Sequence, residues 1–302
     1  MKTDAALTLD NEREDLAEPG LLSDIFTLTK ARLSLLVIIT TLVGYCLASA
    51  SPLNWMGLLN ATLGTALAAA GAGALNQWLE VRVDRLMERT RTRPLPAGRM
   101  SRTTAFIIGT ALSASGVAWL AWTCNATSAW LAAATVITYL ALYTPLKRKT
   151  SLCTIVGAIS GALPPMIGWT AASPSFDLGA WVLFGILFTW QMPHFLAIAW
   201  MYRDEYAQAG FVMLRRDDTS GSSTAFEALG FTGALIAITM IPFWSGMLTE
   251  TYLSGALMLD AAMAGAAVWF LADRSRTSAR ALFFASIIFL PLLLGLMVVT
   301  KA

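Results

Sequence analysis

Residues 76–84 read Asn-Gln-Trp-Leu-Glu-Val-Arg-Val-Asp and end a long apolar segment. Within this stretch Asn76, Glu80 and Asp84 recur every four residues, so on an α-helix they share one face, each about 6 Å from the next. Amide and carboxylate oxygens, together with water, are the ligands that Mg²⁺ prefers in proteins. The spacing therefore predicts a divalent-metal site with Asn76, Glu80 and Asp84 as ligands.

Arginines follow this stretch at once, in residues 89–95, Arg-Thr-Arg-Thr-Arg-Pro-Leu. The planar guanidinium of Arg89 or Arg93 can grip two phosphate oxygens together. Metal ligands beside arginines indicate a diphosphate site. The alternative is a charged loop that leaves a membrane helix, which is the commoner meaning of an arginine cluster. The four-residue spacing of the oxygen ligands favours the diphosphate interpretation.

The composition is that of an integral membrane protein. Of the 302 residues 56% are hydrophobic and only 13% are charged, against about a quarter charged in soluble proteins. Apolar runs close to the ~20 residues that cross a bilayer recur along nearly the whole chain. The sequence predicts an all-α bundle of about nine transmembrane helices, over residues 33–50, 54–79, 103–123, 126–145, 152–172, 178–200, 226–245, 251–271 and 281–300. Residues 1–24 form an acidic, polar tail, and residues 25–302 form one transmembrane domain.

The positive charges predict the orientation of the bundle. Lys and Arg fill the segment before the first span and the second, fourth, sixth and eighth loops, whereas the other loops contain none. Apart from Lys301, every positive charge therefore lies on one side, which the positive-inside rule assigns to the cytoplasm. The amino terminus is predicted to be cytoplasmic and the carboxyl terminus external.

A second polar group follows the sixth span. Asp204 and Glu205 lie at the same end of the bundle as Glu80 and Asp84, so the two acidic pairs are expected to face each other and hold a metal–diphosphate unit from both sides. Alternatively they are solvated loop carboxylates that balance Arg203. In the fourth loop, Lys147 and Arg148 bind the same diphosphate or only set the topology.

His194 and Asp260 are ionisable residues well inside predicted spans. His194 is the only histidine; a continuous helix would place it about 16 Å from Glu205 on nearly the same face. Buried histidines are most often packing residues, but an intramembrane ionisable group merits a functional hypothesis, and imidazole is a common haem ligand. Asp260 lies in the eighth span, and the sequence indicates no partner for it.

These motifs resemble the UbiA superfamily of intramembrane prenyltransferases, and within it the protohaem IX farnesyltransferases (haem O synthases). The motif from Asn76 through Arg93-Pro94 and the later Arg203-Asp204-Glu205 match the two acidic motifs of the superfamily. Gln77 stands where quinone-type members usually have Asp. Three further segments resemble those of the haem-farnesylating subgroup: residues 143–148 (YTPLKR), 161–169 (GALPPMIGW) and 190–195 (WQMPHF). The chain departs from the family pattern at Glu80, where Asp is usual.

The resemblance implies a multi-pass protein of a bacterial inner membrane that transfers farnesyl from farnesyl diphosphate to a vinyl group of haem b, giving haem O. It implies Mg²⁺ held by Asn76, Glu80, Asp84, Asp204 and Glu205, diphosphate contacts from Arg89, Arg93, Lys147 and Arg148, and a haem contact from His194. Substrates and lipid are the expected partners, haem A synthase is a further candidate, and no nucleic acid is expected. The alternatives are a UbiA-type enzyme for a quinone or chlorin precursor, or a transporter, which would place its ionisable groups at midplane in broken helices.

Overall fold

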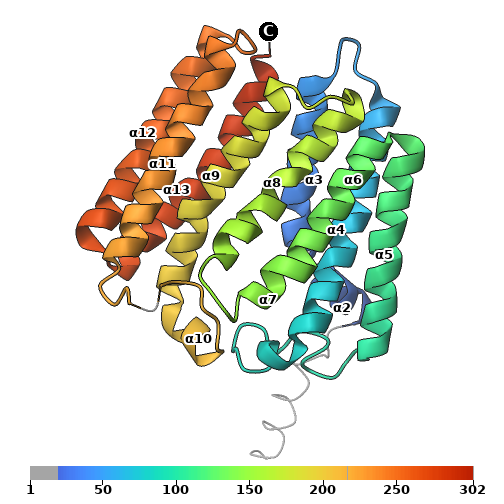
Figure 1. Ribbon diagram of the computed structural model, residues 1–302, viewed down its shortest axis with the longest axis vertical. Coiled ribbons are helices and arrows are strands. Elements are labelled where there is room, and N and C mark those ends of the chain that lie inside the picture. Colours follow the sequence, from blue (N-terminus) through green and yellow to red (C-terminus); the bar gives the residue numbers. More distant parts are fainter. Residues whose placement is uncertain (1–19, 216, 302) are drawn as a thin grey trace, which may run out of the picture.

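A computed structural model describes residues 20–301 except residue 216, so most of the predicted tail, residues 1–19, lies outside the described residues. The described chain is helical, and its one β-bridge joins Leu248 to Lys301. The helices, labelled in Figure 1, are α2 (Leu21–Leu28), α3 (Ala31–Ala48), α4 (Trp55–Asp84), α5 (Arg102–Thr123), α6 (Ala126–Ile137), the π-helix η1 (Thr138–Tyr143), α7 (Thr144–Leu146), α8 (Cys153–Ala172), α9 (Leu178–Met201), α10 (Arg203–Gln208), α11 (Ser222–Trp244), α12 (Glu250–Asp273) and α13 (Arg276–Val299).

The predicted spans are confirmed, with ends that differ by a few residues. Eight helical segments of the described chain are long and apolar enough to cross a membrane, and α2 with α3 makes a ninth if this pair, bent by 57°, counts as one span. One span, Ala126–Leu146, combines α6, η1 and α7. The chain is thus a multi-pass membrane protein.

Short polar residues begin several helices where the apolar runs start. Side chains at the N-caps of α4, α5, α6 and α13 accept a hydrogen bond from the backbone N–H three residues later, which satisfies one donor that the first turn leaves free. These caps are Asn54, Ser101, Asn125 and Ser275.

The helices stand side by side, with α9 packed against α8, α11 and α13, and with α4 packed against α5 (Figure 1). At the crossing of α3 and α8 the two backbones almost touch. A Cβ on Gly44 would lie 2.0 Å from the Pro165 carbonyl oxygen, and one on Gly168 would lie 1.9 Å from that of Thr41. Small residues allow this close packing in lipid.

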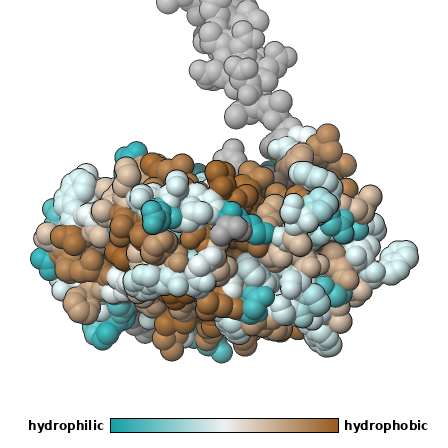
Figure 2. Space-filling model, turned by 90° about the horizontal axis from the view of Figure 1, so that it is seen from above, coloured by the Kyte–Doolittle hydropathy of each residue, from teal (hydrophilic) through white to brown (hydrophobic). Residues whose placement is uncertain are grey.

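The two ends of the bundle differ in character. One end carries α2, α7, α10 and the loop over residues 85–101, and is called the basic end below (Figure 1). The opposite end, viewed in Figure 2, has small hydrophilic patches separated by apolar side chains. The cytoplasmic location of the basic end stays a prediction.

Candidate functional site

A cavity of about 420 Å³ lies within the bundle and reaches the basic end. Its wall combines residues of α3, α4, η1, α8 and α9, with Tyr206 of α10 and Phe211 beyond it. The larger part of the wall is apolar, from residues such as Val37, Ala68 and Ile167. The charged residues on the wall are Lys30, Glu80, Asp84, Arg89, Arg93 and Lys147.

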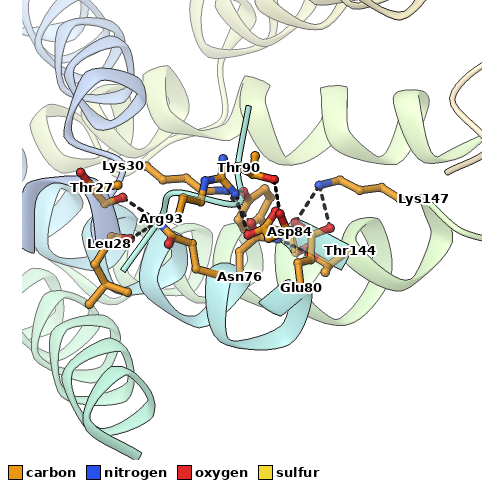
Figure 3. A network of polar contacts seen from close by, with 12 residues as sticks. Thr27, Leu28, Lys30, Asn76, Glu80, Asp84, Thr90, Arg93, Thr144 and Lys147 are labelled. Atoms are coloured by element: carbon orange, nitrogen blue, oxygen red, sulfur yellow. Dashed lines mark hydrogen bonds and ion pairs between the residues drawn. The ribbon is translucent and has the colours of Figure 1, made fainter. Parts of the chain in front are cut away.

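Asn76, Glu80 and Asp84 share one face of the last turns of α4, as their spacing predicts (Figure 3). They are 0%, 7% and 3% exposed. Buried carboxylates are costly unless they are paired, and each has a cation. Lys147 Nζ lies 3.0 Å from Glu80 Oε1, and Arg93 Nη1 lies 2.8 Å from Asp84 Oδ2.

A hydrogen-bond chain fixes which way the Asn76 amide points. Thr144 Oγ1 donates to the Tyr139 carbonyl oxygen at 2.8 Å, so this hydroxyl can only accept from Asn76 Nδ2, 2.9 Å away. Asn76 Oδ1 then faces the ammonium of Lys30, which also donates to the Tyr139 hydroxyl at 3.1 Å. The π-helix η1 thus orients the amide oxygen of Asn76, and such segments are frequent at functional sites.

Lys147 joins the acidic face from the fourth loop. Burial alone would lower the pKa of the Lys147 ammonium, but the Glu80 carboxylate raises this pKa above its ordinary value, so the side chain stays charged. The ammonium also lies 4.5 Å from the centre of the Tyr143 ring. Tyr143 stacks on Tyr139, with ring centres 5.5 Å apart. Two tyrosine rings therefore line the cavity beside the cations.

The sequence predicts Lys30 only as one of the positive charges that set the topology, but its side chain lines the cavity. The residue has the left-handed conformation (φ 51°, ψ 47°) between α2 and α3, which non-glycine residues rarely adopt. Gln77 stabilises this bend because its Nε2 donates to the carbonyl oxygens of Thr27 and Leu28. A Cβ on Gly73 would lie 2.9 Å from the Thr29 carbonyl oxygen, so α4 presses directly against the bend.

The second acidic motif lies beside the cavity. Asp204 has an 88% exposed side chain, 3.7 Å from Arg203, and does not line the wall. Glu205 is partly buried, and its Oε1 has no hydrogen-bond partner among the described residues. Tyr206, the next residue, lines the cavity. Arg148 is exposed and lies outside the wall.

His194 of α9 lines the cavity. The prediction of one continuous helix from His194 to Glu205 is wrong, because α9 ends at Met201 and α10 begins at Arg203, with non-helical backbone at Tyr202. Asp260 lies away from the cavity wall and accepts a hydrogen bond from Thr239 Oγ1 at 2.8 Å.

The oxygens on α4 fit Mg²⁺ by their chemistry. Asn76 Oδ1 and the carboxylates of Glu80 and Asp84 are hard donors, and each already carries an ammonium or guanidinium. The ion pairs show that positive charge is favourable beside the two carboxylates. Among the described residues no three His, Cys, Asp or Glu side chains form a metal-binding group. Mg²⁺ commonly takes one or two carboxylates plus phosphate oxygens and waters, and this arrangement supplies two carboxylates.

Known proteins resemble this chain closely. Residues 37–290 match the UbiA prenyltransferase family. A relative from Solibacter usitatus, named protoheme IX farnesyltransferase, is 41% identical over 92% of this chain and 98% of its own. The mitochondrial protein of that name from Arabidopsis thaliana is 38% identical over 89% of this chain and 62% of its own.

Solved structures share the fold at low sequence identity. A digeranylgeranylglyceryl phosphate synthase superposes with a TM-score of 0.78 at 15% identity, covering 92% of this chain and 98% of that one. A UbiA homolog from Archaeoglobus fulgidus bound to GPP and Mg²⁺ gives 0.65 at 13% identity, with 91% and 99% covered. Because the family match spans residues 37–290 and the Solibacter relative aligns over 98% of its length, this chain belongs to the UbiA prenyltransferase family.

Proposed function

We propose that this protein transfers the farnesyl group of farnesyl diphosphate to a vinyl group of haem b, which yields haem O. The observation that carries the proposal is the gathering of two carboxylates and four basic side chains on the wall of one largely apolar cavity, with the Asn76 amide oxygen behind Lys30. A prenyl diphosphate has this polarity, with a charged head on a long apolar chain. The names of the relatives that align over nearly the whole chain point to haem as the acceptor.

The head of the substrate would bind where α4 ends. Asn76, Glu80 and Asp84 would hold Mg²⁺, with Glu205 and Asp204 approaching from α10. Bound Mg²⁺ would neutralise the departing diphosphate as a Lewis acid. Arg89, Arg93, Lys147 and Lys30 would contact the phosphate oxygens, with Arg148 at the entrance. Because the first four of these residues already line the cavity, they would stabilise the negative charge that develops as the C–O bond breaks.

The apolar wall would hold the farnesyl chain and keep water from the allylic cation. The bond from C1 of farnesyl to the diphosphate oxygen breaks, and both electrons leave with the diphosphate. The terminal vinyl carbon of haem b then bonds to C1, water adds to the other vinyl carbon, and a proton is released. The stacked rings of Tyr139 and Tyr143 line this cavity and can stabilise the cation through their faces.

Other acceptors are less favoured. A quinone or chlorin precursor would use the same diphosphate chemistry, but the relatives with 41% identity carry the haem-related name. Family membership weighs against a transporter. We place the protein in a bacterial inner membrane with the basic end in the cytoplasm, where a positive-inside orientation would put it. Haem A synthase, which would use the product, stays a predicted partner.

Extraction of haem from bacterial membranes tests this function. Membranes with the wild-type chain should contain a new, more hydrophobic haem whose mass corresponds to haem b plus one farnesyl group and one hydroxyl group. Membranes with an equal amount of folded Asp84→Ala protein should contain haem b alone. Haem b alone from wild-type membranes would contradict haem as the acceptor.

A further inference from the structure

The imidazole ring of His194 lines the cavity and is also held in place by neighbouring aromatic side chains. Its imidazole ring lies between two aromatic rings, with Trp190 stacked at 5.2 Å and 21° and Phe283 stacked at 5.0 Å and 28°. Trp190 is itself anchored, because its Nε1 donates to the Ser286 carbonyl oxygen at 2.8 Å. The plane of the His194 ring is therefore fixed by α9 and α13 together.

Ser286 on α13 fixes the tautomer as well. Its Oγ is 2.8 Å from His194 Nδ1 and donates its own hydrogen to the Phe283 carbonyl oxygen at 2.6 Å. Since the single hydroxyl hydrogen is committed to Phe283, the Ser286 oxygen accepts from His194, and Nδ1 must carry the hydrogen. Ser286 is fully buried, so water does not compete for this bond.

The other nitrogen of His194 then bears the lone pair. In the described part of the chain, His194 Nε2 has no hydrogen-bond partner. It is not one of the fully buried unpaired atoms, so it is exposed to open space. His194 lines the cavity, so Nε2 is open to a ligand there. Histidines that bind metals commonly donate their other N–H to a fixed acceptor, which sets the tautomer and the ring orientation.

We propose that His194 Nε2 is the axial ligand of the iron of the haem substrate, and that Ser286 is the positioning residue that holds this nitrogen ready. The proposal rests on the proposed function for the identity of the substrate. It assigns the iron an anchoring role, which holds the porphyrin by its centre while a vinyl group at its edge reacts. The iron and His194 take no part in bond making.

Spectroscopy of purified protein with added haem b tests the ligand. The wild-type protein should give absorption and resonance Raman spectra of iron bound to histidine, and His194→Ala should lose them. Iron-free protoporphyrin IX serves as the comparison ligand. It should bind the wild-type protein at least tenfold more weakly than haem b, and this preference should disappear in His194→Ala. The same histidine spectrum in His194→Ala, or equal wild-type affinity for both porphyrins, would overturn the proposal.

A matched pair of serine variants tests the positioning role. Ser286 and Ser278 are both fully buried on α13, and both donate to the carbonyl three residues before them, but only Ser286 contacts a histidine. Ser286→Ala should lower the Fe–histidine stretching frequency and weaken haem binding by about 10-fold or more, and Ser278→Ala should change neither. An unchanged frequency in folded Ser286→Ala would overturn the role of Ser286.

Farnesyl transfer measured on the same preparations separates this inference from the proposed function. Wild-type protein that converts haem b without a histidine signature would overturn the axial ligand and leave the function standing. Wild-type protein that shows the signature but makes no farnesylated haem would overturn the function and leave the haem site standing.

Discussion

At the scale of single residues, the account depends on Glu80 as an oxygen ligand at the diphosphate end. Glu80→Gln removes a negative charge and the ion pair with Lys147, so metal binding should weaken. We expect farnesyl transfer to fall about 100-fold, as for other losses of one electrostatic contact, and the Mg²⁺ concentration for half-maximal rate to rise. Glu88→Gln is the control, since Glu88 has an 88% exposed side chain four residues beyond Asp84. Equal rates in the two variants would contradict the role of Glu80.

Lys30 gives a second prediction at this scale. Lys30→Gln removes a cation beside Asn76 Oδ1 but keeps a side chain of similar length. The rate of farnesyl transfer should fall by about 10- to 100-fold, with a higher KM for farnesyl diphosphate and an unchanged KM for haem b. Lys149→Gln, an exposed change at the same end, should have wild-type constants. If only the KM for haem b were raised, the predicted contact of Lys30 with farnesyl diphosphate would be contradicted.

The sequence predicted that Asn76, Glu80 and Asp84 share one face, because residues four apart on an α-helix lie one above the other. It did not predict Lys30 as a site residue, because a lysine before a span ordinarily marks topology. Its entry into the cavity depends on a left-handed bend that Gln77 holds from 49 and 50 residues away. The tautomer of His194 depends likewise on Ser286, 92 residues further along the chain.

At the scale of helices, α3 and α8 both line the cavity, and they cross closely beyond it. Gly168→Ala would place Cβ against backbone atoms of Thr41 and Tyr45, and backbone cannot rotate away as a flexible side chain can. We expect a loss of about 1–3 kcal/mol of stability, seen as a lower melting temperature in detergent. Gly265→Ala on α12 has open space around it and should melt like the wild type. Matching melts for both variants would contradict the close crossing.

The lengths of the apolar runs predicted the spans well, because runs of roughly 20 apolar residues are typical of transmembrane helices. They missed the local breaks. The segment 138–143 reads as part of an unbroken span, yet it forms the π-helix whose Tyr139 carbonyl accepts from Thr144. The bend at Tyr202 that separates α10 from α9 was also missed. Pro145, just after the π-helix, lacks an N–H and crowds the carbonyl four residues before it, so the first break had a signal in the sequence, whereas neither Gly nor Pro marks Tyr202.

At the scale of the whole molecule, the charge asymmetry predicts one orientation in the membrane. Arg91→Cys places a thiol at the exposed basic end, and Ser175→Cys places one in an exposed loop at the opposite end. With the three native cysteines replaced, a membrane-impermeant maleimide should label Ser175→Cys in intact spheroplasts and Arg91→Cys only after lysis. The reverse pattern would contradict a cytoplasmic diphosphate site.

The central claim is that one cavity couples metal-assisted departure of diphosphate to farnesylation of haem b. The most direct measurement incubates the purified protein with farnesyl diphosphate, haem b and Mg²⁺, and quantifies pyrophosphate and farnesylated haem in the same samples. We predict equimolar products that EDTA abolishes, and less than about 1% of the wild-type rate with Asp84→Asn. Three results would contradict the account: pyrophosphate without farnesylated haem, a wild-type rate in the presence of EDTA, or a wild-type rate with Asp84→Asn.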